Sequence, residues 1–553
     1  KGQMAIVKGE TSGEIYKSPF SAEFLKTTYN SESRVQEYLP IAERGYLSMT
    51  DGASFSYDGN VTLNYNTLVN EKHIIYAGAG LEVTQNDNNS HGFIMTGFPD
   101  DRYSDPAFAI QYKKETKPSS SESKSRAIGF FANGNYSYDD RYFADVSVRI
   151  DGSSKFGADK KYAPFWSAGA GWNVHNEKFF KHTKISMLKL RYSYGVTGNQ
   201  EFSAYQAKTM FQFNTDRLYN SGISAALMGY GNPDLEWQNQ YQSNYGFDFG
   251  YAKDRIRLQF NYYQKKTEGM LTSVSVAPSL GLPSNTFTSN LGKIQNKGVE
   301  VNLNAVLIRD QGKDFEWSVM LQAAHNKNKI MEISTALKNI NEKNNQDKTT
   351  PAAVYEEGES MSAIKAVPSL GIDPTTGQEL FMKKDGTITY TWDATDKVIC
   401  GDSEPKVFGN VGTNLYWKGW NLNMVFKYDL GADYYNSTLA ERVEGANPRY
   451  NADRRVLNNR WKEPGQHALY KNIKEYTTTY ISSRFVQKEN TLQLTSLSLS
   501  YDLNREWIRK FGLNTMRLSF YMNDVFRAST VKNERGLDYP FQRSFVFGLN
   551  IGF

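Results

Sequence analysis

Apolar and polar residues alternate along most of the chain, and the pattern is clearest near its C-terminal end. In the final run, one face holds the apolar side chains of Phe545, Phe547, Leu549, Ile551 and Phe553. The other face holds the remaining residues of that run, Val546, Gly548, Asn550 and Gly552. Successive side chains of a strand point to opposite faces, so this period of two predicts a β-strand with one apolar face. The run from Met516 to Asn523 alternates in the same way and predicts a partner strand.

The same alternation predicts about 15 strands in total. Before the final pair they lie near 54–68, 73–84, 127–138, 141–150, 165–174, 188–194, 245–251, 256–262, 299–303, 315–324, 407–416, 420–428 and 492–501. Residues 1–50 alternate poorly and predict one strand and a loop. The stretch 87–124 ends in the low-complexity run SSSESKS and is too polar to pack a core, so it is predicted to be a mobile loop.

The connections between these strands alternate between short and long. The short ones are near 70–72, 139–140, 176–185, 252–254, 309–313, 418–419 and 504–512, and the long ones are near 87–124, 151–163, 198–235, 271–295, 332–404, 432–487 and 527–540. Outer-membrane barrels have short periplasmic turns and long extracellular loops. The pattern therefore predicts an all-β fold, a transmembrane antiparallel β-barrel.

Counting back from Phe553 at the periplasmic side places every short link in the periplasm and every long loop outside. The odd strand count, with a first clear strand that runs inward, predicts that an N-terminal part of the barrel precedes this chain. Residues 51–553 are then the C-terminal portion of the barrel, and residues 1–50 are a strand and loop region at a truncated N-terminus. The start, KGQMAIVKGE, has neither the apolar core nor the cleavage site of a signal peptide.

Composition fits a barrel. Of the 553 residues, 14% are aromatic, yet the mean hydropathy is only −0.60, as expected when apolar side chains are spread through alternating strands between polar loops. The chain contains no run of 18 or more apolar residues, so the sequence predicts no transmembrane helix. The net charge of +5 is nearly balanced and does not resemble the basic face of a nucleic-acid-binding protein.

The sequence predicts no catalytic residue, metal site or cofactor. The single Cys400 cannot form an intrachain disulfide, and the six histidines lack the spacing of zinc ligands. The loop GIDPTTGQELFMKKDG at 371–386 lacks the order of an EF-hand and is interpreted as a turn. Carboxylates inside strands, at Asp145, Asp248 and Glu300, are expected to face a wet lumen.

Aromatic side chains have two interpretations. Most tyrosines near strand ends on the apolar face, such as Tyr192, Tyr245 and Tyr262, are expected to form an interface girdle. Those in loops could stack on sugar rings or peptide side chains, or contact a protein that covers the loops. This set comprises Tyr230, Trp392, Tyr434 and Tyr435.

Several stretches resemble a known family. RYFADVSVRIDGSSKFGADKKYAPFWSAGAGW at 141–172, LKLRYSYGVTGNQ at 188–200, NPDLEWQNQYQSNYGFDFG at 232–250, NYYQKKTEGML at 261–271, NLGKIQNKGVEVNL at 290–303 and the closing strands resemble SusC/RagA-type TonB-dependent outer-membrane transporters of Bacteroidetes type. FWSAGAGW stands where the family usually has a proline-serine pair, and MNDVF where it usually has Asn-Leu. Neither departure affects the fold.

The resemblance implies a barrel of roughly 22 strands around an N-terminal plug. It implies import of oligosaccharides or peptides across the bacterial outer membrane, energy from TonB, and a SusD-like surface lipoprotein as a lid; it implies no enzyme activity and no nucleic acid. The plug, the TonB-contacting segment and the first strands are missing from this sequence. The resemblance also implies that the residues Phe545 to Phe553 form the signal recognised by barrel-assembly machinery.

Two other classes of function remain open from the residues alone. A surface adhesin or structural barrel could have the same strands and loops without transport. A secreted enzyme on a β-scaffold is a third possibility, but it explains neither the sorting of loop lengths nor the terminal aromatic residue.

Overall fold

A computed structural model gives the arrangement of the chain. It describes residues 1–29, 34–102, 104–114, 116–157, 160–180, 184–199, 204–219, 222–232, 234–275, 286–290, 292–333, 338, 341–342, 344–349, 351–447, 452–474, 477–532 and 542–553. Parts of the predicted loops at 198–235, 271–295 and 527–540 lie outside these ranges. Within the described ranges, no helix has the length and apolar composition needed to cross a membrane.

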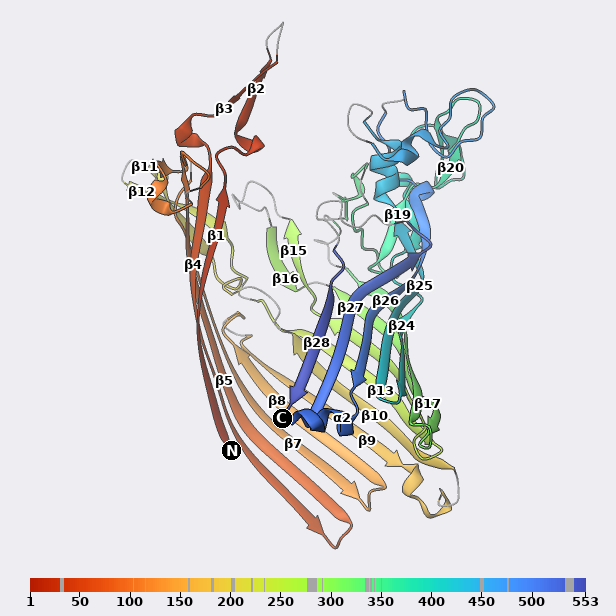
Figure 1. Ribbon diagram of the computed structural model, residues 1–553. Helices are drawn as coiled ribbons and strands as arrows, with labels where there is room; N and C mark the ends of the chain where they lie inside the picture. Colours follow the sequence, from red (N-terminus) through yellow and green to blue (C-terminus); the bar gives the residue numbers. More distant parts are fainter. Residues whose placement is uncertain are drawn as a thin grey trace.

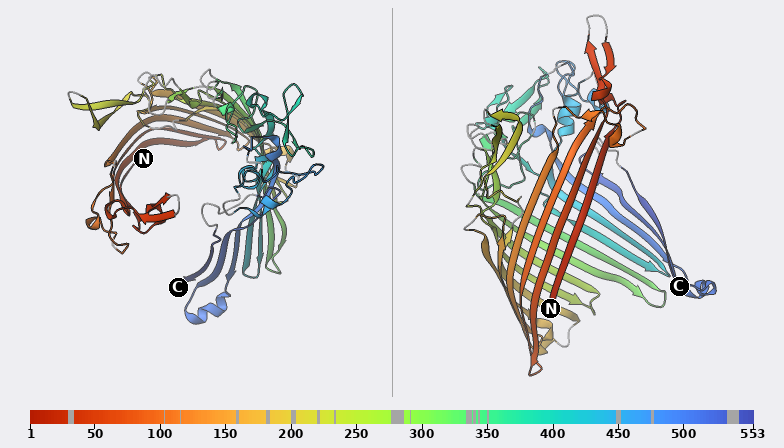
Figure 2. Two further views of the ribbon diagram at one scale, coloured as in Figure 1. Left: turned by 90° about the horizontal axis from the view of Figure 1, so that it is seen from above. Right: turned by 90° about the vertical axis from the view of Figure 1, so that its left-hand side faces the viewer.

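One antiparallel sheet dominates the molecule and curves into an open wall (Figures 1 and 2). The wall strands are β1 (Gly2–Lys17), β4 (Tyr46–Val69), β5 (His73–Thr96), β7 (Ser119–Tyr138), β8 (Tyr142–Ser153), β9 (Tyr162–Asn173), β10 (Ile185–Asn199), β13 (Gln238–Tyr251), β14 (Ile256–Glu268), β17 (Lys293–Asp310), β18 (Phe315–Glu332), β24 (Val407–Trp417), β25 (Trp420–Tyr435), β26 (Val486–Asp502), β27 (Thr515–Ser529) and β28 (Phe545–Gly552). The two-residue β6 (Gln111–Tyr112) lies beside the end of β5 and completes this 17-stranded sheet.

Each wall strand pairs with the next wall strand along the chain, from β1 to β28. Among the described residues, β1 and β28 each have one neighbour, which leaves two open edges. Seen from above in Figure 2, the wall is a curved sheet with a gap between its ends. The predicted all-β architecture is confirmed.

The remaining elements lie mainly in the connections. The short strands are β2 (Leu25–Tyr29), β3 (Arg34–Tyr38), β11 (Met210–Tyr219), β12 (Gly222–Gly229), β15 (Leu271–Ser275), β16 (Thr286–Asn290), β19 (Ala363–Ala366), β20 (Ser369–Ile372), β21 (Glu379–Met382), β22 (Ile388–Thr389) and β23 (Val398–Asp402). The helical turns are η1 (Ala22–Phe24), η2 (Ile41–Glu43), η3 (Pro106–Phe108), η4 (Val174–Asn176), η5 (Lys178–Phe180), η7 (Ala394–Asp396), η8 (Thr438–Glu444), η9 (Arg454–Leu457), η10 (Ser483–Phe485), α2 (Arg505–Ile508) and η11 (Arg509–Phe511).

The predicted sorting of the connections is reproduced in space. The short links lie at one end of the wall and the long loops at the other (Figure 1). Asp139 and Asp140 have φ of 52° each, and Lys418 and Gly419 have φ of 46° and 86°. Positive φ at both central residues is the geometry of the tight hairpin turn that matches strand twist. One connection departs from the predicted sorting. The connection 154–161 lies at the long-loop end, but it is shorter than the connections 174–184 and 503–514 at the other end.

One prediction about the N-terminal third was wrong, and a second was borne out. The run SSSESKS is not a loop: Ser119 to Ser125 belong to β7 and pair with Gly92 to Asn86 of β5. Residues 1–50 hold the 16-residue strand β1, which pairs along its whole length with β4. With β1 included the wall has 16 strands besides the two-residue β6, close to the predicted count of about 15. The segment Ser119 to Ser125 is polar on each face, and backbone pairing with β5 holds it where no apolar pattern marks a strand.

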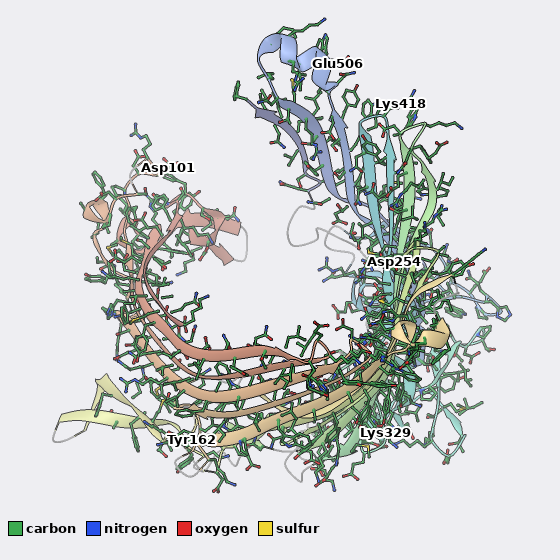
Figure 3. All side chains as sticks on the ribbon, turned by 90° about the horizontal axis from the view of Figure 1, so that it is seen from below. Asp101, Tyr162, Asp254, Lys329, Lys418 and Glu506 are labelled. Atoms are coloured by element: carbon green, nitrogen blue, oxygen red, sulfur yellow. The ribbon has the colours of Figure 1, made fainter. Side chains whose placement is uncertain are left out.

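The two faces of the wall differ in chemistry. On β4, Val61, Leu63 and Tyr65 share one face and are 61–76% exposed. Asn60, Thr62 and Asn64 occupy the opposite face. Directly paired residues share a face, so the strand register extends this assignment around the sheet. The register places Tyr162 and Lys329 on the face of Leu63, and Figure 3 shows both on the convex side of the wall.

Aromatic pairs connect neighbouring strands on the convex face. The rings of Tyr192 and Tyr245 have centroids 4.7 Å apart, and those of Tyr245 and Tyr262 are 6.2 Å apart. Phe247 and Phe260 stack at 5.3 Å. Each such cross-strand pair contributes about 0.2–1 kcal/mol relative to a pair of alanines. The tyrosines predicted to form a girdle are thus consecutive partners on the convex face.

Candidate functional site

The concave face of the wall carries charged strand residues that form ion pairs between strands. Arg191 donates to Asp248 at 2.8 Å, and Arg149 donates to Glu82 at 2.8 Å. The register places Asp145, Asp248 and Glu300 on this face, opposite the apolar stripe. Their predicted position facing the interior of the curve is therefore confirmed. Of these three carboxylates, Asp248 forms an ion pair across strands, with Arg191.

Toward the long-loop end, the concave face changes to small uncharged side chains. On the paired segments 50–56 of β4, 86–92 of β5 and 119–125 of β7 it presents only serine, threonine, asparagine and glycine: Thr50, Gly52, Ser54, Ser56, Asn86, Asn88, Ser90, Gly92, Ser119, Ser121, Ser123 and Ser125. Charged residues of the same segments, such as Asp87 and Lys124, lie on the convex face and pair at 2.8 Å. The side chains of this surface can donate hydrogen bonds to, and accept them from, hydroxyl or amide groups of a ligand. The ligand need not be charged.

A cavity of about 520 Å³ lies near the rim of the wall, where residues of loop 154–161 meet β4, β5, β7 and β8. Tyr57, Ile128 and Tyr162 line it from the convex face. The cavity therefore does not belong to the uncharged concave surface.

The two longest connections fold together at the long-loop end. We call the described parts of 333–406 and 436–485 the loop unit. Its buried apolar residues come from both connections and include Ala366, Val367, Ile372, Phe381, Ala440, Val443, Val456 and Ile481. Val367 donates its backbone N–H to Ile481, and Ser483 donates to Val367 in return. The loop unit is thus a small packed structure with its own core.

A buried ionic network joins the two connections. Arg484 donates at 2.8 Å to Glu444 and at 2.8 Å to Glu379. The side chains of Glu444 and Glu379 are 0% and 5% exposed. Burial lowers the pKa of Arg484, but its hydrogen bonds to Glu444 and the nearby Glu379 carboxylate outweigh that effect and raise the pKa above its ordinary value. Arg484 therefore stays charged and ties the loops together.

Arg460 supports the same region through the backbone. Its guanidinium donates to the carbonyl oxygens of Val456 at 2.6 Å, Lys471 at 3.1 Å and Glu444 at 3.0 Å, and also to that of Val443. The residue is 4% exposed. Carbonyls in an irregular loop lack helix or sheet partners, and a buried polar group without a partner is costly. Arg460 thus satisfies the inner backbone of the loop unit.

The loop aromatics have different roles. Trp392 stacks on Tyr480 at 5.1 Å, donates to the carbonyl of Ile481 at 2.9 Å and contacts the Lys397 ammonium. Tyr435 packs edge-on against Phe485, and Tyr434 lies beside it in β25. These contacts assign Trp392 and Tyr435 to packing of the loop unit. Tyr230 is 43% exposed and is available for contact.

The segment 371–386 forms the predicted turns. Asp373 accepts hydrogen bonds from the Thr375 backbone N–H at 2.8 Å and from the Thr376 hydroxyl at 3.1 Å. Gly377 and Gly386 have φ of +74° and +85°, which favours glycine. The turns connect β20, β21 and β22. The interpretation of this sequence as hairpin turns is confirmed.

The residues proposed for barrel assembly lie on the last wall strand. Phe547 pairs with Phe520, Leu549 with Leu518 and Ile551 with Met516. These apolar residues and their partners share the convex face. The exposed fractions of the five proposed signal side chains lie between 43% and 88%; these residues are Phe545, Phe547, Leu549, Ile551 and Phe553. Their position fits contact with lipid, and their role as an assembly signal stays a prediction.

Sequence reasoning missed the ionic network of the loop unit. Arg484 lies 105 positions from Glu379 and 40 positions from Glu444. No local spacing relates the three residues, and each occurs in a polar loop where charge is expected. A signal that pairs residues across such distances requires many related sequences or the fold itself.

Comparisons with known proteins place the chain in a family. The family model described as "TonB dependent receptor-like, beta-barrel" matches residues 16–523. "TonB-dependent receptor P3" of Formosa agariphila is 28% identical over 79% of this chain and 46% of its own length. "TonB-dependent receptor SusC" of Bacteroides thetaiotaomicron is 23% identical over 90% of this chain and 51% of its length.

Among solved structures, "Structure of the RagAB peptide transporter" matches with a TM-score of 0.85 at 21% identity and covers 100% of this chain and 60% of the matched chain. The chain spans about half the length of the curated relatives it matches. The match at low identity concerns the fold, and it includes the curved wall and its loops. Because the family model covers most of the sequence, the chain belongs to the TonB-dependent receptor-like β-barrel family of the bacterial outer membrane.

Proposed function

We propose that the parent protein imports a nutrient, an oligosaccharide or a peptide, across the outer membrane, and that this chain forms most of the barrel wall. The observation that carries the proposal is the contrast between faces: an apolar convex face for lipid and a polar concave face that leads from the loop end to the turn end. A transported solute needs such a continuous polar lining. The proposal assigns no catalytic reaction to the chain.

We also propose that residues 51–553 are the C-terminal portion of a larger closed barrel of roughly 22 strands. The open edges at β1 and β28 support this, since an unpaired strand edge exposed to lipid costs several kcal/mol for each unsatisfied group. The length of the curated relatives is consistent with it. Residues 1–50 contribute β1 and the beginning of β4 to this wall, and the β2–β3 hairpin lies in the connection between these two strands.

The proposed partners are a SusD-like surface lipoprotein and TonB. The loop unit supports the first of these, because it is a folded platform at the loop end rather than a set of separate loops. A lid protein can dock on such a platform without first ordering it, which lowers the entropic cost of binding. Energy coupling through TonB would use parts of the parent protein outside this chain.

Deletion of the parent gene is expected to abolish growth on one class of oligosaccharide or peptide and leave growth on simple sugars and amino acids unchanged. Growth on single carbon sources measures this, and restoration by the intact gene is the control. A surface adhesin predicts the opposite pattern. Unchanged growth on every oligosaccharide and peptide, with lost surface attachment, would contradict import.

Removal of Phe553 is expected to reduce the amount of assembled barrel in the outer membrane while the remaining strand pairs stay compatible with the fold. The reason is that the barrel-assembly machinery is proposed to bind the β28 residues during assembly, before this strand pairs with its neighbours. Immunoblots of outer-membrane fractions with heat-modifiable migration measure the outcome. Truncation within the exposed 383–386 turn is the control, and normal assembly without Phe553 would disprove the signal.

A further inference from the structure

The apolar stripe on the convex face ends abruptly on four neighbouring strands. Its last apolar residues toward the loop end are Tyr245 on β13, Tyr262 on β14 and Val299 on β17, and the exposed His325 is the register partner of Val299 on β18. The next convex positions on these strands are Ser243, Gln264, Lys297 and Lys327. The surface thus changes from apolar to polar within one step along each strand.

The length of the stripe locates this boundary. On β18, the convex side chains Trp317, Val319, Leu321 and Ala323 are apolar, and His325 follows them on the same face. A membrane-spanning strand needs about 9–11 residues. The stretch from Trp317 to His325 has the length needed to cross the hydrocarbon core, which would put Lys327 at the level of the headgroups. Because Lys327 lies on the long-loop side of the stripe, these headgroups belong to the outer leaflet.

Two lysines at this level face each other directly. Lys297 on β17 is the register partner of Lys327 on β18, and both are exposed. Lys329, two residues further on the same face, is also exposed and lies on the convex side in Figure 3. Like charges directly opposite on neighbouring strands destabilise a sheet. The arrangement calls for an anion that offsets the repulsion.

Nearby basic residues of the convex face have acidic partners. Lys266 pairs with Glu268 at 2.7 Å, and Lys293 pairs with Glu332 at 2.7 Å. On the far part of the wall, Lys124 pairs with Asp87 at 2.8 Å. Within the described part of the chain, Lys297, Lys327 and Lys329 form no ion pair with a carboxylate. Their charge is therefore available to a ligand outside the protein.

We propose that Lys297, Lys327 and Lys329 bind the phosphate group of a lipid in the outer leaflet of the outer membrane. Three ammonium groups on one exposed face complement a phosphate, and the apolar stripe beneath them receives the acyl chains of the same molecule. The tyrosine ladder of Tyr245 and Tyr262 lies at the boundary between the two. The site depends on the membrane location of the barrel and not on the identity of its cargo.

The test uses the full-length parent protein in neutral detergent with purified lipopolysaccharide as the probe. We expect lipopolysaccharide to raise the thermal unfolding temperature of the parent protein. In the Lys297→Gln/Lys327→Gln/Lys329→Gln variant, the apparent affinity should fall on the order of tenfold or more, since each basic group near an anionic lipid surface adds to binding. Without lipopolysaccharide, the variant should be at least as stable as the parent, because the like-charge pair is gone.

Two controls make the outcome specific. Lys313→Gln removes the same charge from the turn at the other end of the β17–β18 hairpin, and it should leave lipopolysaccharide binding unchanged. Dephosphorylated lipopolysaccharide should bind the parent protein as weakly as the variant binds the intact lipid. Equal stabilisation of parent and triple variant, or equal binding of the dephosphorylated lipid to the parent, would overturn the proposal.

A single variant guards against loss of assembly. Lys327→Gln removes one of the two facing charges and keeps the remaining contacts of β18. It should retain heat-modifiable migration, bind lipopolysaccharide more weakly than the parent, and lose part of the salt dependence of binding, since ionic contacts are screened at high ionic strength. A folded Lys327→Gln variant with unchanged affinity and unchanged salt dependence would also contradict the site.

Discussion

Replacing Arg484 by methionine is expected to unfold the loop unit while the wall stays assembled. The change leaves the carboxylates of Glu444 and Glu379 buried without their shared cation, with side chains 0% and 5% exposed. Removing one partner of a buried ion pair costs about 3–5 kcal/mol. The loop unit has a small core of its own, so a loss of this size exceeds what its packing can offset.

Proteinase K digestion of the assembled protein measures this outcome. We expect rapid cleavage within 333–406 and 436–485 in the Arg484→Met variant, together with unchanged heat-modifiable migration of the wall. Arg102→Met is the matched control: its ion pair with Asp100 is exposed, at 74% for the arginine side chain, and exposed pairs contribute little. Equal protease resistance of Arg484→Met and the parent protein would show that the network does not hold the loops together.

Replacing Leu63 by arginine is expected to impair insertion of the barrel. Leu63 lies on the convex face of β4 between Val61 and Tyr65, and it is 76% exposed there. An arginine at the middle of the bilayer on the lipid face of a barrel costs about 2–4 kcal/mol. Refolding into lipid vesicles, followed by the fraction that shows heat-modifiable migration at increasing urea, measures the loss.

A concave position on the same strand provides the control for this variant. Asn66→Arg introduces the same side chain on β4 but on the concave face, where it meets water and polar residues. We expect this variant to insert nearly as well as the parent protein. If Asn66→Arg were the more damaging of the two, the assignment of convex and concave faces would be reversed along the whole wall, because the register fixes all strands together.

The wall was predictable because its information is local. Alternation in runs such as Met516 to Asn523 is visible in a few adjacent residues, and it exists because lipid contacts one face and water the other. Tight turns at Asp139-Asp140 and Lys418-Gly419 are equally local. The membrane itself imposes the pattern, so each strand that crosses it carries the same pattern independently of its partners.

The prediction was wrong where the strands leave the membrane. Ser119 to Ser125 in β7 continue the wall beyond the apolar stripe, where polar residues occupy both faces. No difference in polarity between faces remains there, so the sequence resembles that of a loop. The continuation depends on backbone pairing with β5, which only the assembled sheet supplies.

The sequence by itself therefore determined the all-β class, the positions of most strands, the ends at which turns and loops lie, and the family. The tertiary structure decided which distant residues meet: Arg484 with Glu379 and Glu444, and Lys297 with Lys327. Strand alternation arises from contact with solvent or lipid and needs no partner to be recognised. A contact between residues far apart in the chain depends on register and loop packing, because a shift of one residue would move each side chain to the other face.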